Sequence, residues 1–453
     1  MTYRDPQSCT DSGKLNTVPN KDQIMNMRIR PSSVSGRTQA PPSKSYTHRA
    51  ILAAGLSKHV TISDALDSAD TRASRRAATS FGAAISNSGN EIVVDGANGS
   101  PQVSPNVVDC ANSGTTMRLA SGIAGLVDGI TILTGDASLR SRPQGPLLDA
   151  LTQLGVRAES ATGDDTAPLV LRGPIEGDSV TIPGDVSSQY VSALLMAGGL
   201  TEDGIDISLS TPLKSAPYVD ITTEVLDDFG IETEKTSNGF LVEGGQSYER
   251  EEPYAVPGDF SSISYPAAAG AVAGDPGVTI GGARPSSQGD TAIIDILERM
   301  GATVSWDQDA GMLTVEKAPL QGVTVDVSDT PDLLPTVAAL GTIADGSTRI
   351  TNCEHVRYKE TDRVRAMANE LTALGAVVDE SQDELVVHGG DSQLRGTTVD
   401  GYDDHRIIMA LSITGLVAAG ETIIRGVEHV DVSYPNFFDA MTNLGVDATD
   451  VKK

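Results

Sequence analysis

The stretch RAMANELTALGAVV, residues 365–378, contains the pattern that decides the fold of this 453-residue chain. Apolar residues at helical spacing lead to Leu374-Gly375-Ala376 and then to β-branched residues, which predicts a helix, a glycine cap with positive φ, and a strand. The same phrase recurs at intervals of roughly 70–75 residues, as Phe81-Gly82-Ala83, Leu154-Gly155-Val156, Phe229-Gly230-Ile231, Met300-Gly301-Ala302 and Leu444-Gly445-Val446. The chain therefore contains six copies of one structural unit.

A second phrase lies between these glycines and consists of a small-residue helix, a glycine turn and a β-branched strand. Clear copies are GIAGLVDGITIL (residues 122–133) and TGLVAAGETII (residues 414–424). Each unit then has two helices and about four strands, which is too little chain to bury a core alone. We expect the six units to stack three by three into two domains, because one core rarely organises more than about 250–300 residues.

The composition is strongly acidic and excludes one class of protein. Lys and Arg total 33 against 61 Asp and Glu, a formal net charge of -28. Nucleic-acid binding needs a basic surface, so the sequence argues against that class. The negative charges are spread along the chain, which favours a halophile's cytoplasm, where concentrated salt screens their mutual repulsion. An ordinary acidic protein is the alternative.

Cysteine usage and the termini indicate the compartment. Cys9, Cys110 and Cys353 are odd in number and form no CxxC pair, so neither a disulfide framework nor a zinc site is predicted. No apolar run reaches the about 18 residues that span a bilayer, and the N-terminus lacks a signal-peptide apolar region. We expect a cytoplasmic protein in which residues 1–26 are a flexible extension.

The motif PPSKSYTHR, residues 41–49, predicts an anion receptor. Its two prolines fix the entry to a helix whose first turns carry Lys44, Ser45 and Arg49. The partial positive charge of the helix N-terminus adds to the two cations, so a carboxylate or phosphate would be held here. A solvated charged face is the alternative.

Three further motifs precede predicted helices and offer phosphate-binding groups. They are ANSGTTMR (residues 111–118) with Asn112, Gly114 and Arg118, SLRSRPQG (residues 138–145) with Arg140 and Arg142, and DVSSQY (residues 185–190) with Ser187, Ser188 and Gln189. Backbone N–H groups, hydroxyls and arginines suit phosphate. Ordinary helix capping gives the same pattern, so each motif alone leaves both readings open.

Two charged clusters lie in the C-terminal half. The first, EHVRYKETDR (residues 354–363), places charges of both signs at a strand-to-helix junction, and surface salt bridging is its alternative reading. The second, YDDHR (residues 402–406), stands directly before an apolar helix. A metal site there is poorly supported, because His405 has no second His or Cys at ligand spacing.

Eleven motifs from about residue 27 onward closely resemble, in chain order, the series of the 5-enolpyruvylshikimate-3-phosphate synthase family. They are PSKSYTHR, NSGTTMR, SRPQGPL, SSQY, KSAPYVD, GDFSS, QGD, TPDLLPT, RYKETDR, DDHR and SYPNFF. The resemblance implies an α/β (α+β) two-domain enolpyruvyl transferase fold with six βαβαββ repeats, three per domain, as an inside-out α/β barrel. It implies that residues 27–42 and 258–453 form domain I, that residues 43–257 form domain II, and that the active site lies in the cleft between them.

The activity that the resemblance implies is transfer of the enolpyruvyl group of phosphoenolpyruvate to the 5-hydroxyl of shikimate 3-phosphate, with release of phosphate. This step belongs to the shikimate pathway of aromatic amino acid biosynthesis. The expected partners are the two small-molecule substrates, with no metal, no organic cofactor, no nucleic acid and no membrane. We expect a monomer.

The resemblance also assigns roles to individual residues. Shikimate 3-phosphate would contact Lys44, Ser45, Arg49, Ser187, Ser188, Gln189, Ser215, Tyr218, Asp332 and Lys359. Phosphoenolpyruvate would contact Lys44, Asn112, Gly114, Arg142, Gln189, Arg363, Asp404 and Arg406, with Arg363 and Arg406 as the carboxylate clamp. Glu360 would carry a proton to C3 and Asp332 would accept the hydroxyl proton, while Lys44 and Arg142 stabilise the departing phosphate.

Two positions depart from the family pattern, and two other functions remain as alternatives. His355 stands where Asn is frequent, and Val432 stands where Lys is frequent, so a phosphoenolpyruvate contact is missing for which we expect Lys44 and Arg142 to suffice. A UDP-N-acetylglucosamine enolpyruvyl transferase is one alternative, although that enzyme usually has a reactive loop Cys and resembles this chain poorly. A non-catalytic repeat protein that binds anionic metabolites is the other, although pure anion binding would select against carboxylates such as Asp332 and Glu360.

Overall fold

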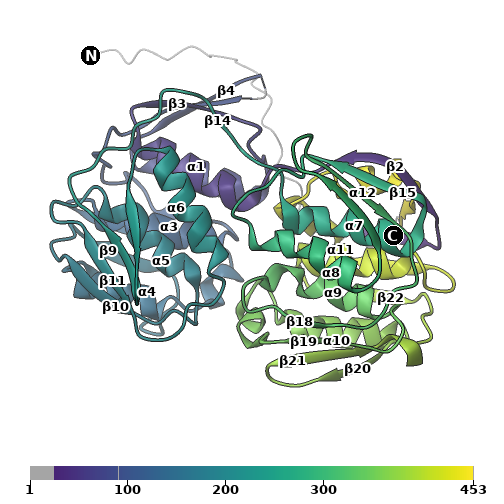
Figure 1. The fold of residues 1–453 in the computed structure, drawn as a ribbon. Helices are drawn as coiled ribbons and strands as arrows, with labels where there is room; N and C mark the ends of the chain where they lie inside the picture. Colours follow the sequence, from purple (N-terminus) through teal and green to yellow (C-terminus); the bar gives the residue numbers. More distant parts are fainter. Residues whose placement is uncertain (1–24, 90, 452–453) are drawn as a thin grey trace, which may run out of the picture.

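The computed structural model describes residues 25–89 and 91–451, and Figure 1 shows them folded into two lobes. Buried apolar side chains form one cluster in each lobe. The first cluster runs from Tyr46 to Val256 and defines the continuous lobe. The second joins Met27–Ala40 to Phe260–Val446 and defines the discontinuous lobe, so the chain starts in this lobe, leaves it and returns.

Three units build the continuous lobe, each in the order βαβαββ. The first contains β14 (Tyr254–Ala255), α1 (Lys44–Leu56), β3 (His59–Ser63), α2 (Ala69–Ser80), β4 (Ala84–Ser88) and β5 (Glu91–Asp95). The second contains β6 (Val108–Asp109), α3 (Gly114–Gly125), β7 (Ile130–Thr134), α4 (Gly145–Gln153), β8 (Arg157–Ser160) and β9 (Leu169–Arg172). The third contains β10 (Ser179–Ile182), α5 (Ser188–Gly198), β11 (Ile205–Leu209), α6 (Pro217–Asp228), β12 (Thr233–Thr236) and β13 (Gly239–Val242).

Three units of the same order build the discontinuous lobe. The first contains β2 (Val34–Gln39), α7 (Phe260–Ala273), β15 (Gly274–Gly281), α8 (Ile293–Arg299), β16 (Thr303–Asp307) and β17 (Met312–Glu316). The second contains β18 (Thr324–Asp326), α9 (Leu334–Gly341), β19 (Ser347–Thr351), α10 (Arg363–Ala373), β20 (Val377–Glu380) and β21 (Glu384–His388). The third contains β22 (Thr398–Asp400), α11 (His405–Gly415), β23 (Thr422–Arg425), α12 (Phe437–Asn443), β24 (Asp447–Asp450) and β1 (Asn26–Arg30).

The sheets of all six units share one pairing pattern. In the β6-β7-β9-β8 sheet, β6 runs parallel to β7, β7 runs antiparallel to β9, and β9 runs antiparallel to β8. The other sheets repeat this order of one parallel and two antiparallel pairs. The prediction of six βαβαββ repeats, three per lobe, is therefore confirmed.

The repeated glycines adopt the backbone conformation that the sequence predicts. Each follows the last helix of its unit, and the six φ angles are +108° at Gly82, +88° at Gly155, +80° at Gly230, +96° at Gly301, +92° at Gly375 and +106° at Gly445. A side chain is strained at such angles, whereas glycine is not. These glycines end the helices and turn the chain into β4, β8, β12, β16, β20 and β24.

Two neighbouring chain crossings connect the lobes and hydrogen-bond to each other. Ser43 N donates to Pro257 O over 2.7 Å, and Asp259 N donates to Pro41 O over 2.9 Å. The Asp259 carboxylate also accepts from Lys44 N over 3.1 Å. This contact ties the backbone of Lys44, the first residue of α1, to the N-cap residue of α7. The crossing itself therefore positions Lys44.

The start of the described chain bears on the prediction of a flexible N-terminal extension. Residues 1–24, most of the predicted flexible extension, lie outside the described residues. Met25 N donates to Glu428 Oε2 over 3.0 Å, and Asn26 pairs with Arg425 in β1, so Met25 and Asn26, the last two residues of the predicted extension, are bonded to the discontinuous lobe. Every helix in the described part is too short or too polar to cross a membrane.

Candidate active site

Residues of several predicted motifs line a cavity between the two lobes. Its wall includes residues at or near the N-terminal ends of α1, α2, α3, α5 and α6 from the continuous lobe, and of α10 and α11 from the discontinuous lobe. The N-terminus of a helix carries partial positive charge and unpaired N–H groups. Several such ends around one cavity favour anionic guests in a chain whose overall charge is strongly negative.

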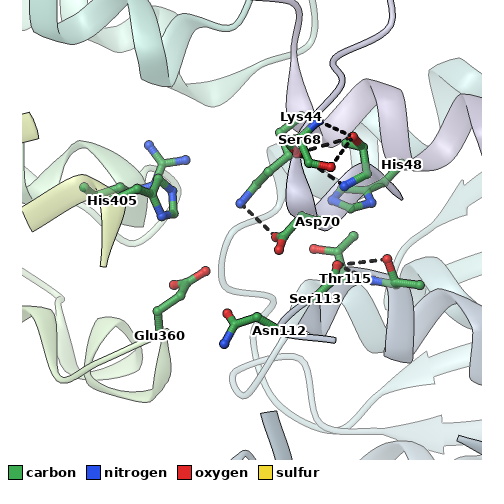
Figure 2. Close-up of polar contacts among 12 residues, drawn as sticks. Lys44, His48, Ser68, Asp70, Asn112, Ser113, Thr115, Glu360 and His405 are labelled. Atoms are coloured by element: carbon green, nitrogen blue, oxygen red, sulfur yellow. Dashed lines mark hydrogen bonds and ion pairs between the residues drawn. The ribbon is translucent and has the colours of Figure 1, made fainter. Parts of the chain in front are cut away.

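Lys44 lies on this wall as the first residue of α1. Its Nζ is 3.4 Å from Asp70 Oδ2, and Figure 2 shows the pair facing Glu360 and His405 of the other lobe. Burial raises the pKa of Asp70, although the nearby Lys44 charge opposes the rise. Asp70 therefore restrains the Lys44 ammonium at the cavity without being a strongly stabilised anion.

Arg142 lines the cavity, and part of its guanidinium has no partner among the described residues. The side chain is buried, and its Nη2 donates to Asn112 Oδ1 over 3.1 Å and to Ser138 Oγ over 3.2 Å. Its Nε has no hydrogen-bond partner within residues 25–89 and 91–451. A Cβ at Gly114 would lie 3.2 Å from Arg142 Nη1, so glycine at this position leaves the room that the guanidinium occupies.

Gln189 is held by neighbours on α3 rather than directed freely into the cavity. Its Oε1 accepts from Arg118 Nη1 over 2.8 Å, and its Nε2 donates to Thr115 Oγ1 over 2.9 Å. The Ser187 side chain accepts from Gln189 N over 3.3 Å and caps α5. The capping reading of this motif is therefore correct for Ser187, although Ser187, Ser188 and Gln189 all line the cavity.

Three carboxylates contact the guanidinium of Arg363 at the same time. Its Nε lies 2.7 Å from Asp404 Oδ2, its Nη1 lies 2.7 Å from Asp332 Oδ1, and its Nη2 lies 2.6 Å from Glu360 Oε2. Burial lowers the pKa of Arg363, but these three anions outweigh burial and raise it above its ordinary value. A substrate carboxylate that binds Arg363 therefore competes with Asp332 and Glu360 for the guanidinium.

Replacing Arg363 by methionine is expected to destabilise the folded state by about 3–5 kcal/mol, because it leaves the buried Asp404 carboxylate without its cation. Denaturant unfolding in concentrated KCl measures this loss. Arg365→Met on the same helix is the matched control, because Arg365 is exposed and its partner Glu380 keeps Arg357 as a second cation, so the loss is expected to be at most about 1 kcal/mol. Equal losses in the two variants would contradict a structural role for the Arg363–Asp404 pair.

Arg406 differs from Arg363 because most of its donors are unused. It is almost fully buried, and its Nη2 contacts Asp332 Oδ2 at 2.7 Å and Ser261 Oγ at 3.1 Å. Neither its Nε nor its Nη1 has a partner among the described residues. Unpaired donors on a buried guanidinium cost free energy until an acceptor completes them, which favours an anionic guest beside Arg406.

Two of the carboxylates on the wall, Asp332 and Glu360, are strongly held as anions in this structure. Burial alone would raise the pKa of Asp332, but Arg406, Arg363 and Lys359 hold it well below its usual range. Burial likewise opposes ionisation of Glu360, and the charges of Arg363, Arg142 and Lys44 lower its pKa well below the ordinary value. Both carboxylates would become more basic if an anionic guest took over these cations.

The cavity wall contains most of the residues predicted as site residues. These are Lys44, Ser45, Gly114, Arg142, Ser187, Ser188, Gln189, Ser215, Tyr218, Asp332, Lys359, Glu360, Arg363 and Arg406. They come from both lobes and from segments hundreds of residues apart. The wall does not include Arg49, Asn112 or Asp404.

The three predicted residues behind the wall have their polar atoms engaged by the protein. Arg49 donates to Thr222 Oγ1 over 2.8 Å and to Tyr218 O over 2.9 Å, which ties α1 to α6. Asn112 accepts from Arg142 and donates to Asp136. Asp404 caps α11 and pairs with Arg363. Direct substrate contacts from these residues remain predictions, because in this structure they support the residues that do line the cavity.

Several cavity residues were not among the predicted contacts. Asp70, Thr115, Arg118, Val186, Lys214, His355 and Tyr358 also line the wall. Thr115, Arg118 and Lys214 stand inside motifs that indicated anion binding, so their neighbours were the available signal. Asp70 had no signal, because an acidic residue in the first turn of α2 looks like ordinary helix stabilisation.

The two positions that depart from the family pattern have different locations. His355 lines the cavity, and burial together with Lys359 and Lys214 lowers its pKa to about 3, so its imidazole is neutral at neutral pH. Its Nε2 has no partner in the described part of the chain. Val432 ends the 3-10 helix η6 (Val427–Val432) and does not line the cavity.

Comparison with known proteins identifies relatives along almost the whole chain. The family model described as EPSP synthase (3-phosphoshikimate 1-carboxyvinyltransferase) matches residues 29–441. A 3-phosphoshikimate 1-carboxyvinyltransferase of Halorubrum lacusprofundi is 61% identical over 93% of this chain and 98% of its own length, and one of Halobacterium salinarum is 58% identical over 93% and 99%. The solved EPSP synthase of Acinetobacter baumannii superposes with a TM-score of 0.80 at 25% identity, covering 94% of this chain and 100% of that one.

Proposed function

The chain belongs to the EPSP synthase family, and on this premise we propose that its cavity binds shikimate 3-phosphate and phosphoenolpyruvate and joins them. The enolpyruvyl group of phosphoenolpyruvate is transferred to the 5-hydroxyl of shikimate 3-phosphate, and inorganic phosphate is released. The haloarchaeal relatives and the acidic composition are consistent with a reaction in a concentrated salt solution.

One observation carries the proposal: two buried arginines from opposite lobes line the same cavity, and each keeps guanidinium nitrogens without a partner among the described residues. Arg142 Nε belongs to the continuous lobe, and Arg406 Nε and Nη1 belong to the discontinuous lobe, and none has a partner among the described residues. Phosphoenolpyruvate carries a phosphate at one end and a carboxylate at the other. We assign the phosphate to Arg142, Lys44 and Gly114, and the carboxylate to Arg406 with Arg363.

Shikimate 3-phosphate then occupies the part of the cavity lined by hydroxyls. We assign its phosphate to Ser187, Ser188 and Ser215, and its ring to the region between Gln189 and Tyr218. Lys359 and the neutral His355 contact its hydroxyl groups from the discontinuous lobe. Neutral donors and hydroxyls limit the positive charge that would otherwise gather around two anionic substrates.

The chemistry uses two of the carboxylates on the wall, Asp332 and Glu360. Glu360, which takes up a proton when the substrates bind, delivers it to C3 of phosphoenolpyruvate while the 5-hydroxyl oxygen attacks C2 and gives its proton to Asp332, which yields a tetrahedral ketal. Return of a C3 proton to Glu360 and loss of phosphate from C2 then form the product enol ether, and the proton held by Asp332 leaves with the inorganic phosphate. Binding of the substrate carboxylate to Arg406 and Arg363 draws these cations from Asp332 and Glu360, which raises the proton affinity of both.

We extend the proposal to the organisation of the chain. The two apolar clusters support a domain I of residues 27–42 and 258–453 and a domain II of residues 43–257, with the boundaries at the two crossings. The cavity lies between them, so neither domain alone holds a complete site. Since both halves of the site come from one chain, a monomer suffices for activity.

The deciding experiment compares acceptors. The purified protein in concentrated KCl is expected to release phosphate from phosphoenolpyruvate when shikimate 3-phosphate is added, and to remain at background with UDP-N-acetylglucosamine. Mass spectrometry of the product checks for the added enolpyruvyl group. Release with the UDP-sugar would favour the related transferase, and calorimetric binding of phosphoenolpyruvate and shikimate 3-phosphate without release would favour an anion-binding protein.

The described cysteines bear on the UDP-sugar alternative. Cys110 and Cys353 are buried, and burial raises the pKa of each thiol to about 12. A nucleophilic cysteine needs an accessible thiolate at working pH. Neither thiol lines the cavity, which is consistent with a mechanism that depends on carboxylates instead.

A further inference from the structure

Asp290 is a buried carboxyl group beside the cavity to which the mechanism above gives no role. It lies in the QGD motif, in the 3-10 helix η2 (Gly289–Ala292), and is 5% exposed. Its Oδ2 is 3.3 Å from the hydroxyl of Tyr218. Its Oδ1 is buried and has no hydrogen-bond partner among the described residues.

The same hydroxyl group contacts a second carboxyl group. Tyr218 O–H is 2.9 Å from Asp332 Oδ2, so Tyr218 of the continuous lobe stands between two aspartates of the discontinuous lobe. A phenol has one proton and can donate to only one of them. If both carboxyls were ionised, one of them would face the phenol oxygen without a proton between them.

The surroundings decide which carboxyl group carries the negative charge. Asp332 has Arg363 Nη1 and Arg406 Nη2 at 2.7 Å, whereas no Lys, Arg or His of the described chain forms an ion pair with Asp290. A buried carboxylate without a cation or a full set of donors is costly, and the group takes up a proton instead. The neutral acid also resolves the contact with Tyr218, because its O–H can donate to the phenol oxygen while the phenol donates to Asp332.

We propose that Asp290 is a neutral carboxylic acid in the working enzyme and acts as a positioning residue, whose proton fixes the Tyr218 hydroxyl as a donor to Asp332. The proposal rests on the proposed function, in which Asp332 accepts the proton of the substrate hydroxyl. It goes beyond that function by making the orientation of this acceptor depend on a second, uncharged aspartate.

Electrostatics around Asp290 agree with this arrangement. Burial is the main cause that raises the pKa of Asp290 to about 8, and the negative charge of Asp332 adds to the rise. The positive charge of Arg406 opposes it. Asp259 at the start of α7 adds a further negative charge. On α8, Asp295 and Arg299 form an exposed ion pair 3.4 Å apart, and solvent screens both charges. Above pH 8 an ionised Asp290 would compete for the Tyr218 proton and repel Asp332.

The first test compares two substitutions through pH profiles of phosphate release. Asp290→Asn supplies an N–H donor in place of the acid proton, so kcat at pH 7 is expected to stay within about threefold of the wild type. It is also expected to persist above pH 8, where the wild type declines. Asp290→Ala is expected to lower kcat about 10- to 100-fold at pH 7. If Asp290→Asn is as inactive as Asp290→Ala, or declines above pH 8 as the wild type does, the proposal is overturned.

The second test needs no substrate and separates the inference from the proposed function. An Asp in the unfolded chain ionises near pH 4, so a folded state that keeps the proton until pH 8 loses stability as pH rises between these values. Asp290→Asn lacks this loss. The ratio of the unfolding equilibrium constants of wild type and Asp290→Asn is therefore expected to rise about tenfold per pH unit between pH 5 and 7 and to level off above pH 8.

Denaturant unfolding in concentrated KCl measures this ratio, with Asp295→Asn as the control on an exposed carboxyl group. The control is expected to follow the wild type at every pH. Parallel curves for wild type and Asp290→Asn would overturn the proposal even if the enzyme is active. If the wild type releases no phosphate, the proposed function is rejected. The unfolding measurement still decides whether Asp290 is protonated.

Discussion

Glu360→Gln is expected to lower kcat for phosphate release by about 10²- to 10⁴-fold, the range of a lost general acid–base group. Glutamine keeps the size of the side chain, and its amide oxygen can still accept from Arg363 Nη2, which Glu360 Oε2 contacts at 2.6 Å. It has no acid proton to deliver to C3 of phosphoenolpyruvate. The Michaelis constants of both substrates are expected to change little, because the charges that hold the substrates remain.

Steady-state phosphate release at saturating substrates checks this result. The matched control is Glu354→Gln in the same motif, because Glu354 is exposed and, among the described residues, its carboxylate accepts only from Gln382 Nε2, at 3.2 Å. That control is expected to keep kcat within about twofold. A Glu360→Gln enzyme with nearly unchanged kcat would show that the proton for C3 comes from another group on the wall.

Arg142→Ala is expected to lower kcat/KM for phosphoenolpyruvate by about 10²- to 10³-fold. Arg142 is proposed to hold the substrate phosphate both before and during its departure, so the loss is expected in KM and in kcat. Its own protein contacts are single hydrogen bonds to Asn112 and Ser138, so removal of the side chain breaks no buried ion pair. The fold is therefore expected to survive the substitution.

Arg140→Ala is the natural control, because it lies two residues away in the same motif and its exposed side chain donates to Gly135 O. It is expected to leave kcat/KM for phosphoenolpyruvate unchanged, and the KM for shikimate 3-phosphate is expected to be similar in all three proteins. If Arg142→Ala binds phosphoenolpyruvate as tightly as the wild type, then Lys44 and Gly114 hold the phosphate without it. The hypothesis that Lys44 and Arg142 together replace the lysine missing at position 432 would then be wrong.

Most of the residues that the resemblance and the local sequence predicted as site residues lie on the cavity wall. Lys44, Gly114, Ser188 and Arg406 could be located because each stands at the start of a helix that its own neighbours define. Asp70 and Asp290 could not. Their sequence contexts are those of ordinary helix ends, and their relevance depends on Lys44, Tyr218 and Asp332, which lie far away in the sequence.

The sequence likewise could not predict which carboxyl groups of the site carry a proton. A glutamate and an aspartate in charged motifs suggest an acid and a base, but their pKa values depend on which cations the fold brings to them. Arg363 contacts Asp332, Glu360 and Asp404 together, whereas Arg406 keeps unpaired donors. The chain positions of these two arginines give no sign of this difference.

The amino-acid sequence alone determined the repeating unit and its six positive-φ glycines, because helix periodicity, caps and φ preferences act over a few neighbouring residues. Only the tertiary structure decided which strands complete each unit, as when β14 joins β3 and β1 joins β23 and β24. It also decided which charges meet in the cavity. These pairings join residues up to several hundred positions apart, and their free energy comes from burial and mutual contact, which no local pattern encodes.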